Sequence, residues 1–443
     1  MKLFGTDGLR GHAGEFPLDP ASVHLIGEEL GRLAKKENRP VVVGGDTRES
    51  TPDLLTELAG GIRASSGQVR CAGTITTPGV AELVLALGAS SGVSISASHN
   101  PWQDNGIKIF GSDGKKWPDP WETELENALL ARQSDGPASS RRSAEPAPEP
   151  DPRLAGAYLE RLEKRISSSL NNIYIVIDAG NGAAFRLAPA AFQRAGGRAE
   201  AIHAQPDGRN INADCGALHP ESMAKTTRER GAAMGVAYDG DADRSIFADE
   251  TGRILDGDDV LWIVATHWKR RGTLPAGGVV GTVMSNYALE AGFEREGIPF
   301  ARSAVGDRNV ARLMEERSAA IGGEASGHIL LPGSPAGDGI ATSLVLAQLL
   351  VETAEPLSRL ATLEKVPQIL RNIRVARRAP IEDFPRIAEA VRRAERTLDH
   401  RGRVFLRYSG TEPLLRILVE GFDAQAVAAT ANELEAVVRA ELA

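Results

Sequence analysis

Short runs of β-branched residues recur along the chain, each followed by a loop rich in Gly, Asp or Ser and then by a helical pattern. Such runs lie at residues 41–43, 93–95, 173–177 and 279–280, and the loops after them read GGDTR, SASHNP, DAGNG and GTVMSN. This alternation is typical of α/β proteins, whose ligands bind at the carboxyl ends of the strands. We therefore expect an α/β fold with its chemistry in these loops.

The composition limits the classes of protein to consider. The chain has 443 residues, more than the roughly 100–200 of one domain, which predicts two to four domains. A formal net charge of −8 without a basic block argues against a nucleic-acid or membrane surface. The N-terminus lacks the apolar stretch of a secretory signal, and no apolar run approaches about 20 residues. Cys71 and Cys215 are the only cysteines, too few for a disulfide framework, so we expect a cytoplasmic protein.

Changes in composition divide the chain. Residues 133–152 are rich in Pro, Ser, Ala and Glu and predict an exposed linker, and a second break lies near residues 356–367. With a further boundary near Asp256, the expected domains comprise residues 1–150, 151–255, 256–366 and 367–443, the first three sharing one βα plan. The last is expected to end in a helix capped by Asp423, with an apolar face of Val427, Ala431, Leu434 and Val438.

Three carboxylates alternate in the loop DGDADR, at Asp239, Asp241 and Asp243, between two apolar segments. Carboxylates that converge repel one another unless a cation lies between them. Their hard oxygen atoms favour Mg²⁺, Mn²⁺ or Ca²⁺ over Zn²⁺ and leave positions for phosphate oxygens. An acidic surface turn is the alternative, and an EF-hand is disfavoured because no Glu stands at the twelfth position. The pattern favours a divalent-metal site.

The segment SASHNP (96–101) follows an apolar strand and precedes DNGIK (104–108). A serine in such a loop can act as a nucleophile or carry a phosphate, although a turn held by Ser and Asn side chains is the alternative. No G-x-S-x-G elbow is present, which weakens an acyl-hydrolase interpretation. A phosphoserine near the aspartate loop is more coherent, because its added charge needs a nearby cation.

Three other loops combine glycine with polar residues. RYSGTEP (407–413), with Arg416 close by, suits a phosphate cradle, and a solvated hairpin is the alternative. GTDGLRG (5–11) is weak alone and is not a Walker loop. In GGEASGH (322–328), alternating residues would face one side of an extended chain and suit sugar hydroxyls and proton transfer, although a polar strand edge is equally consistent. These alternating residues are Glu324, Ser326 and His328.

Taken together and in order, FGTDGLRG, SASHNP with NGIK, DGDADR, GEASGH and RYSGTEP resemble the α-D-phosphohexomutase superfamily over essentially the whole chain. GTVMSN, GIPFARSAVGDR, PQIL and RGRVFLRYSGTEPLLR are similar to its bacterial phosphoglucosamine mutase branch. The resemblance implies three α/β mixed-sheet domains and a small C-terminal α+β domain around a central cleft. The sequence departs mildly at Ala242, where many members have Gly, and at the variable position Ala325.

The resemblance also implies roles for the residues that match family motifs. Ser98 would carry the phosphoryl group. One Mg²⁺ would be held by a phosphoserine oxygen of Ser98 and by Asp239, Asp241 and Asp243. The residues near the reacting oxygen would be Arg10, Lys108 and His328. The substrate would be bound by Arg244, Gly306, Asp307, Arg308, Glu324, Ser326, Arg407, Ser409, Gly410, Thr411 and Arg416.

The implied reaction is the reversible conversion of glucosamine 6-phosphate to glucosamine 1-phosphate, which feeds UDP-N-acetylglucosamine synthesis. Glucosamine 1,6-bisphosphate would be activator and intermediate, and a kinase or autophosphorylation would first load Ser98. Phosphomannomutase/phosphoglucomutase activity is the alternative within the family. A Mg²⁺ phosphatase would leave SASHNP and RYSGTEP without roles, and a non-catalytic sugar-phosphate binder is disfavoured because the reactive loops are intact. We expect an amino-sugar phosphate as substrate and no nucleic-acid or membrane partner. A homodimer is compatible with these expectations.

Overall fold

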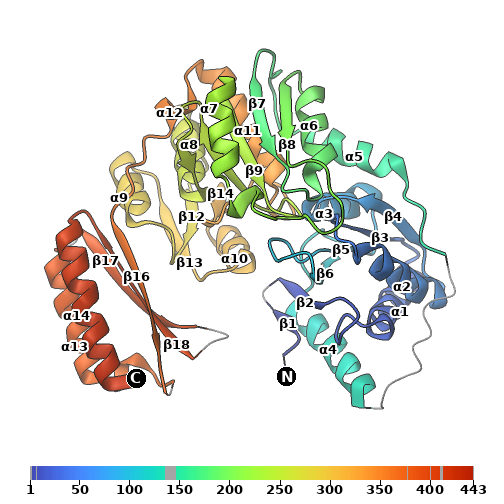
Figure 1. Cartoon of the computed structure of the whole chain (residues 1–443), viewed down its shortest axis with the longest axis horizontal. Coiled ribbons are helices and arrows are strands. Elements are labelled where there is room, and N and C mark those ends of the chain that lie inside the picture. The colour runs from blue at the N-terminus through green and yellow to red at the C-terminus, as the bar shows by residue number, and fades with distance from the viewer. Residues whose placement is uncertain are drawn as a thin grey trace.

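The computed structural model describes residues 2–5, 7–134, 146–376, 378–399, 401–409 and 413–442. Gly410 and Thr411, two of the expected phosphate ligands, lie outside these residues. The described residues form four β-sheets, which follow one another along the chain from blue to red in Figure 1. We name the parts that carry these sheets and their helices the first, second, third and fourth units. The domain boundaries given above remain a prediction.

The first unit has a six-stranded sheet of order β1-β2-β6-β5-β3-β4, in which β3 is parallel to β4 and β5 and the other pairs are antiparallel. Its strands are β1 (Phe4–Gly5), β2 (Gly8–His12), β3 (Val41–Gly45), β4 (Val69–Thr74), β5 (Ser91–Ile95) and β6 (Asp104–Gly111). Its helices are α1 (Pro20–Glu37), α2 (Thr51–Ala64), α3 (Thr77–Leu87) and α4 (Asp119–Ser134). β3 is buried along its whole length, as expected of a central parallel strand.

The second unit has a five-stranded sheet of order β11-β10-β9-β7-β8, and the third a four-stranded sheet of order β13-β12-β14-β15. The second contains α5 (Pro152–Glu163), β7 (Tyr174–Asp178), α6 (Ala184–Arg194), β8 (Arg198–Ile202), η1 (Gly216–Leu218), α7 (Glu221–Arg230), β9 (Met234–Tyr238), β10 (Ser245–Asp249) and β11 (Ile254–Leu255). The third contains α8 (Gly257–Arg270), β12 (Val279–Thr282), α9 (Tyr287–Glu296), β13 (Phe300–Ser303), α10 (Asp307–Arg317), β14 (Ile321–Gly323), β15 (Ile329–Leu330), α11 (Gly339–Thr353) and α12 (Leu357–Leu360).

The first three units repeat one arrangement. A central strand (β3, β7 or β12) lies between two parallel partners, and one of these partners (β5, β9 or β14) continues through a loop into an antiparallel neighbour. This confirms the α/β class and the shared βα plan. Of the predicted linker at 133–152, residues 135–145 lie outside the described residues; at its two ends α4 continues to Ser134 and α5 begins at Pro152.

The fourth unit has an antiparallel sheet of order β16-β18-β17. Its elements are β16 (Gln368–Arg374), η2 (Ile381–Asp383), α13 (Pro385–Leu398), β17 (Gly402–Tyr408), β18 (Leu414–Gly421) and α14 (Ala424–Leu442). The predicted apolar face of the last helix is confirmed, since Val427, Ala431, Leu434 and Val438 are buried. The Asp423 carboxylate accepts hydrogen bonds from two backbone N–H groups at the start of α14, at 2.9 and 3.1 Å.

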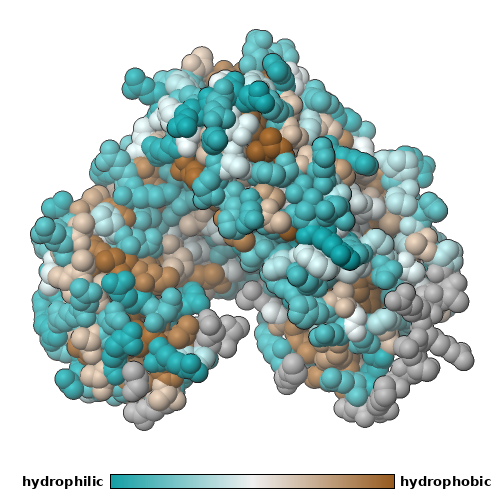
Figure 2. All heavy atoms as spheres, in the orientation of Figure 1, coloured by the Kyte–Doolittle hydropathy of each residue, from teal (hydrophilic) through white to brown (hydrophobic). Residues whose placement is uncertain are grey.

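The apolar cores separate the fourth unit from the rest. One core runs from Val42 of the first unit through the second and third units to Val366. The first unit has a further core of its own. A separate core, from Ile373 to Leu442, holds the fourth unit together. In Figure 1 the fourth unit lies opposite the first with the second and third above them, and Figure 2 shows a hollow between the two lower parts.

A helix that crosses a bilayer must be both long and apolar, and the helices of the described residues do not meet these requirements.

Candidate active site

Three loops that sequence reasoning selected occupy equivalent places in the repeated arrangement. SASHNP connects β5 to β6, DGDADR connects β9 to β10, and the residues around Glu324 connect β14 to β15. Each loop therefore begins at the carboxyl end of a parallel strand and leads into an antiparallel strand. The shared topology brings the reactive residues of three units to one region, at strand ends where α/β proteins bind ligands.

Ser98 lies fully buried in the loop after β5, with a backbone φ of 54°. This left-handed conformation is uncommon for a residue other than Gly, Asn or Asp. The Ser98 hydroxyl donates a hydrogen bond of 2.6 Å to Asp239 Oδ2, and His99 Nδ1 lies 3.2 Å from the same Oγ. Burial and the charges of Arg244 and Arg10 lower the pKa of His99 to about 4. The serine of the first unit thus contacts the aspartate loop of the second.

Arg48 holds the Ser98 loop in place. Its buried guanidinium donates to the carboxylate of Asp46 at 2.8 Å and to the backbone carbonyl oxygens of Ser98 and Asn100 at 3.0 and 2.9 Å. It also donates to the carbonyl oxygens of two residues further along the loop, Pro101 and Asp104. Asn212 of the second unit donates to the Ser98 carbonyl oxygen at 3.0 Å. These donors fix the backbone that carries the Ser98 hydroxyl.

Asp239, Asp241 and Asp243 lie between β9 and β10, and one carboxylate oxygen of each lies within 4.8 Å of the others. The Oδ1 atoms of Asp241 and Asp243 are buried and have no hydrogen-bond partner among the described residues. Buried polar atoms are normally paired, so these two oxygens suit a metal ion. The confirmed strands on both sides exclude the helices of an EF-hand. Ala242 has a φ of 55°, a left-handed conformation that Gly adopts more readily than Ala.

The three carboxyl groups differ in their electrostatic surroundings. Burial and the neighbouring charges of Asp243 and Asp241 raise the pKa of Asp239 well above its usual value. Burial alone would raise the pKa of Asp243 as well, but Lys108 and the His328 ring hold it well below its usual range. Asp239 is therefore better able than Asp243 to hold a proton when no metal is bound.

A chain of alternating charges connects the aspartate loop to the first and third units. The Lys108 ammonium group lies 2.8 Å from Asp241, 3.0 Å from Asp243 and 2.8 Å from Asp7. Lys116 lies 2.5 Å from Asp7 and 2.6 Å from Asp307. Although burial opposes it, the three carboxylates raise the pKa of Lys108 well above its usual value, so Lys108 is a permanent cation.

Arg10 and Arg244 add positive charge to this region. Arg10 donates to Asn100 Oδ1 at 2.9 Å and to Asp7 at 2.7 Å, so it contacts the Ser98 loop and the charge chain. The backbone N–H of Arg244 donates to Asp239 Oδ1 at 3.1 Å. The Arg244 side chain is partly exposed, and its Nε has no hydrogen-bond partner among the described residues. A phosphate is the kind of ligand that such an N–H group binds.

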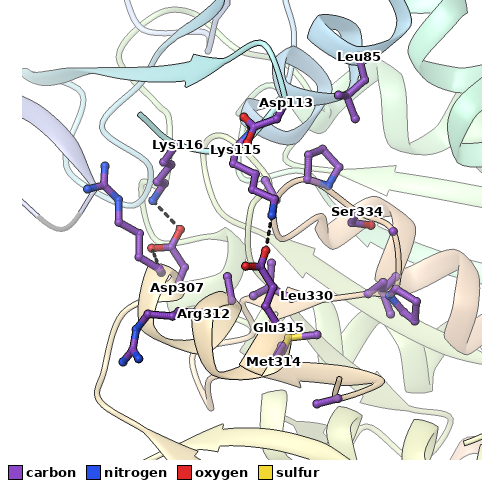
Figure 3. A pocket seen from close by; sticks show the side chains of 18 of the residues that line it. Leu85, Asp113, Lys115, Lys116, Asp307, Arg312, Met314, Glu315, Leu330 and Ser334 are labelled. Atoms are coloured by element: carbon purple, nitrogen blue, oxygen red, sulfur yellow. Dashed lines mark hydrogen bonds and ion pairs between the residues drawn. The ribbon is translucent and has the colours of Figure 1, made fainter. Parts of the chain in front are cut away.

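Lys116 and Asp307 also line a pocket of about 980 Å³ between the first and third units. Figure 3 shows Lys115 reaching Glu315 of α10 beside the Lys116–Asp307 pair, with Leu85, Met314 and Leu330 on the apolar part of the wall. The two ion pairs join the first unit to the third next to the candidate active site.

The residues expected to contact the sugar differ in their exposure and in the partners that they contact. Glu324 accepts a hydrogen bond from the backbone N–H of Gly306 at 3.0 Å. The chain at 324–327 turns instead of running extended, so Ser326 is exposed whereas His328 is buried, 3.9 Å from Asp243. Burial opposes protonation of His328, but Asp243 and Asp307 raise its pKa. Arg308 forms ion pairs with Asp119 and Glu122 of α4.

The expected phosphate ligands that the structure describes lie apart from this cluster, in the fourth unit. Arg407 of β17 stands directly opposite Arg416 of β18, and Ser409 follows β17. Burial and the charge of Arg416 lower the pKa of Arg407, as expected for cations that are held together before an anion binds. The paired ends of β17 and β18 face the open space between the fourth and first units (Figure 1).

Sequence reasoning selected the reactive side chains but missed residues that support them. The missed residues include Asp7, Asp46, Arg48, Thr77, Lys116 and Asn212. Asp46 and Arg48 lie in GGDTR, a loop that was recognised as a strand end but given no role. A charged pair at the end of an all-apolar strand was the signal that could have identified them.

The sequence matches the profiles of four known domain families. The profiles described as phosphoglucomutase/phosphomannomutase alpha/beta/alpha domains I, II and III match residues 1–135, 156–252 and 256–366, and that of the C-terminal domain matches residues 370–437. The four profiles together follow the four units along the chain.

Individual relatives give the same result. The chain is 44% identical to a phosphoglucosamine mutase of Koribacter versatilis (95% of this chain, 92% of the relative) and 42% identical to one of Sorangium cellulosum (98% and 92%). Among solved structures, a phosphoglucomutase/phosphomannomutase family protein of Burkholderia thailandensis superposes with a TM-score of 0.80 at 24% identity, covering 99% of this chain and 97% of that one. The structural match supports the fold.

Proposed function

Because this chain belongs to the phosphoglucosamine mutase family of phosphohexomutases, we propose that it interconverts glucosamine 6-phosphate and glucosamine 1-phosphate. This makes it an isomerase, an intramolecular phosphotransferase. One observation carries the proposal. The hydroxyl of a buried serine, Ser98, lies 2.6 Å from a carboxylate of an aspartate trio in which two buried oxygens accept no hydrogen bond from the described residues. A nucleophile, a cation site and a phosphate are the three components that phosphoryl transfer brings together.

The donor set fits Mg²⁺. Asp239, Asp241 and Asp243 offer only oxygen atoms, and an oxygen of phosphorylated Ser98 would complete the set on the protein side. When bound, the metal neutralises charge on the phosphoryl group and orients it. Lys108 contacts Asp241 and Asp243 directly, so it places a fixed positive charge next to the proposed metal site.

The transfer balances as an exchange between two hydroxyl groups. A hydroxyl oxygen of the sugar forms a bond to phosphorus as the bond to Ser98 Oγ breaks, and the proton of the sugar hydroxyl ends on Ser98 Oγ. In that product state Ser98 donates its proton toward Asp239 Oδ2, which is the hydrogen bond of 2.6 Å described above. The second half-reaction reverses these steps at the other end of the 1,6-bisphosphate, after the intermediate has turned over.

The remaining residues are assigned by their charge and place. Arg10, Arg244 and His328 are assigned to the reacting phosphate, whose charge they would stabilise. Arg10 contacts Asn100 of the Ser98 loop, and Arg244 and His328 each lie 3.9 Å from Asp243, which supports this assignment. Glu324 and Ser326 bind sugar hydroxyls, and the loop of Gly306, Asp307 and Arg308 takes part in substrate choice. The phosphate that does not react is held by Arg407, Ser409, Gly410, Thr411 and Arg416. Because these ligands lie in the fourth unit, that unit is expected to move toward the first on substrate binding.

Other parts of the proposal concern the protein in the cell. We propose that it works in the cytoplasm, where it supplies glucosamine 1-phosphate for UDP-N-acetylglucosamine synthesis. Glucosamine 1,6-bisphosphate would act as activator, and a kinase or autophosphorylation would load Ser98 for the first time. Formation of a homodimer is a further prediction.

The test is a mutase assay followed by ³¹P NMR. Glucosamine 6-phosphate, glucose 6-phosphate and mannose 6-phosphate would each be supplied with Mg²⁺ and a trace of the matching 1,6-bisphosphate. We expect the fastest formation of a 1-phosphate from glucosamine 6-phosphate and no turnover in Ser98→Ala. Faster conversion of glucose or mannose phosphate would contradict the assigned substrate. Turnover in Ser98→Ala would contradict the phosphoserine, and inorganic phosphate as sole product would indicate a phosphatase.

A further inference from the structure

A second group of possible metal ligands lies in the second unit, outside the aspartate trio. Asp178 is the last residue of β7, His203 follows β8, and Cys215 precedes η1. One ligand atom from each of these three side chains lies within 4.8 Å of the others. Asp178 Oδ2 and His203 Nδ1 are 2.9 Å apart.

Hydrogen bonds of the backbone bring these three segments together. Asn181 N–H donates to the carbonyl oxygen of His203 at 2.7 Å. The Asp178 carboxylate accepts from the N–H groups of Gly180 and Gly216 at 2.8 and 3.1 Å. These hydrogen bonds hold the three side chains close together without a bound ion. A preformed set of ligands lowers the entropic cost of binding an ion.

We propose that Asp178, His203 and Cys215 bind a borderline or soft divalent cation such as Zn²⁺. The combination of sulfur, imidazole nitrogen and carboxylate oxygen suits Zn²⁺ and differs from the all-oxygen trio, which suits Mg²⁺. Cys215 is fully buried, and its sulfur makes only a long contact, 3.9 Å from Asn181 Nδ2, among the described residues. His203 is 35% exposed, which leaves solvent a route to the site.

The binding reaction balances as a replacement of a proton by the metal. The sulfur–hydrogen bond of Cys215 is replaced by a sulfur–metal bond, and one proton is released to solvent. The hydrogen bond from His203 Nδ1 to Asp178 is replaced by a nitrogen–metal bond, and the proton of Nδ1 moves through solvent to Nε2, so the ring stays neutral. Three protein ligands leave a fourth position for water. No oxidant or reductant is involved.

The site is linked to the loop of the nucleophile. Asn212, which precedes Cys215 by three residues, donates to the Ser98 carbonyl oxygen at 3.0 Å. The carbonyl oxygen of Asn181 accepts from the Thr47 hydroxyl at 2.5 Å, next to Arg48. A metal that fixes the 203–215 segment therefore acts on the backbone that positions Ser98.

The test uses Co²⁺ as a spectroscopic substitute for Zn²⁺, added to the whole protein in excess Mg²⁺, which occupies the all-oxygen trio. Cobalt bound to a thiolate gives a sulfur-to-metal charge-transfer band in the near ultraviolet, whereas oxygen ligands alone do not. We expect this band at one Co²⁺ per chain, with its loss on addition of one equivalent of Zn²⁺.

Variants assign the band to the site. Cys215→Ser is expected to abolish it, and Cys71→Ser, which removes the other cysteine, is the matched control that keeps it. His203→Gln alters a partly exposed side chain and is expected to weaken Co²⁺ binding at least tenfold while the protein stays folded. Absence of the band in the wild-type protein would overturn the proposal. So would a band that persists in Cys215→Ser, or Co²⁺ binding that His203→Gln leaves unchanged.

Discussion

Arg48→Lys tests whether the guanidinium group of Arg48 positions the nucleophile. Arg48 is 1% exposed and donates five hydrogen bonds, one to Asp46 and four to carbonyl oxygens between residues 98 and 104. A lysine keeps the positive charge but offers three donors from a single nitrogen. At least two of these five hydrogen bonds are therefore lost.

The structure bounds the size of the effect. A buried acceptor without a donor costs about 1–3 kcal/mol, but the carbonyl oxygens nearest the surface can bond to water instead. We expect the substitution to reduce the stability of this region by about 1–3 kcal/mol in total. The larger effect is on catalysis, because an error of about 1 Å in the position of a reacting group lowers the rate by roughly 100-fold.

The assay is mutase turnover with glucosamine 6-phosphate at saturating Mg²⁺. We expect kcat to fall by roughly 100-fold while KM changes little, because the residues proposed to bind the substrate phosphate lie in the fourth unit. Arg39→Lys, at an exposed arginine far less constrained by hydrogen bonds, is the control and should behave as wild type. An unchanged kcat in Arg48→Lys would refute the positioning role, and so would a fall that appears only in KM.

Three other substitutions test separate parts of the site and of the core. Asp241→Asn removes a proposed metal ligand and a partner of Lys108, so the Mg²⁺ concentration for half-maximal activity should rise at least about tenfold; an unchanged requirement would contradict the metal assignment. Arg407→Ala should raise KM for the sugar phosphate about 10–100-fold with a smaller change in kcat, because a charge-assisted hydrogen bond is lost; an unaltered KM would count against it. Burial raises the pKa of Asp338 from 3.8 to about 6, so its ionisation destabilises the folded state as the pH rises through that range. The stability of Asp338→Asn relative to wild type should therefore increase by up to about 3 kcal/mol between about pH 4 and about pH 8, measured by chemical unfolding, and a pH-independent difference would exclude this cause.

Much of the fold was predictable because local patterns and tertiary packing agree. The run at 41–43 forms a central parallel strand, and Val427, Ala431, Leu434 and Val438 form the buried face of the last helix. The linker predicted at 133–152 overlaps the end of α4, and its residues 135–145 lie outside the described residues. Composition identifies residues that cannot fill a core, but α4 extends into that stretch as far as Ser134.

Within the candidate site, the sequence predicted which loops carry reactive groups but not how these groups are paired. Loop motifs selected Ser98 and the aspartate trio, which the fold brings within hydrogen-bond distance across two units. The contacts of Arg48 with the Ser98 loop and of Lys116 with Asp307 could not be predicted in this way, because the two partners lie 50 or more residues apart in the chain. Pairing over such separations depends on the tertiary structure.

The separate core of the fourth unit has a consequence for how the protein loses its structure. Side chains that share one core unfold cooperatively, so the first three units are expected to melt largely together, whereas the unit from Ile373 to Leu442 can open by itself. A ligand that contacts both the fourth unit and the first three units binds only when all of them are folded. It stabilises the folded state by an amount that depends on the ligand concentration relative to the dissociation constant. Saturation with such a ligand therefore merges two melting transitions into one.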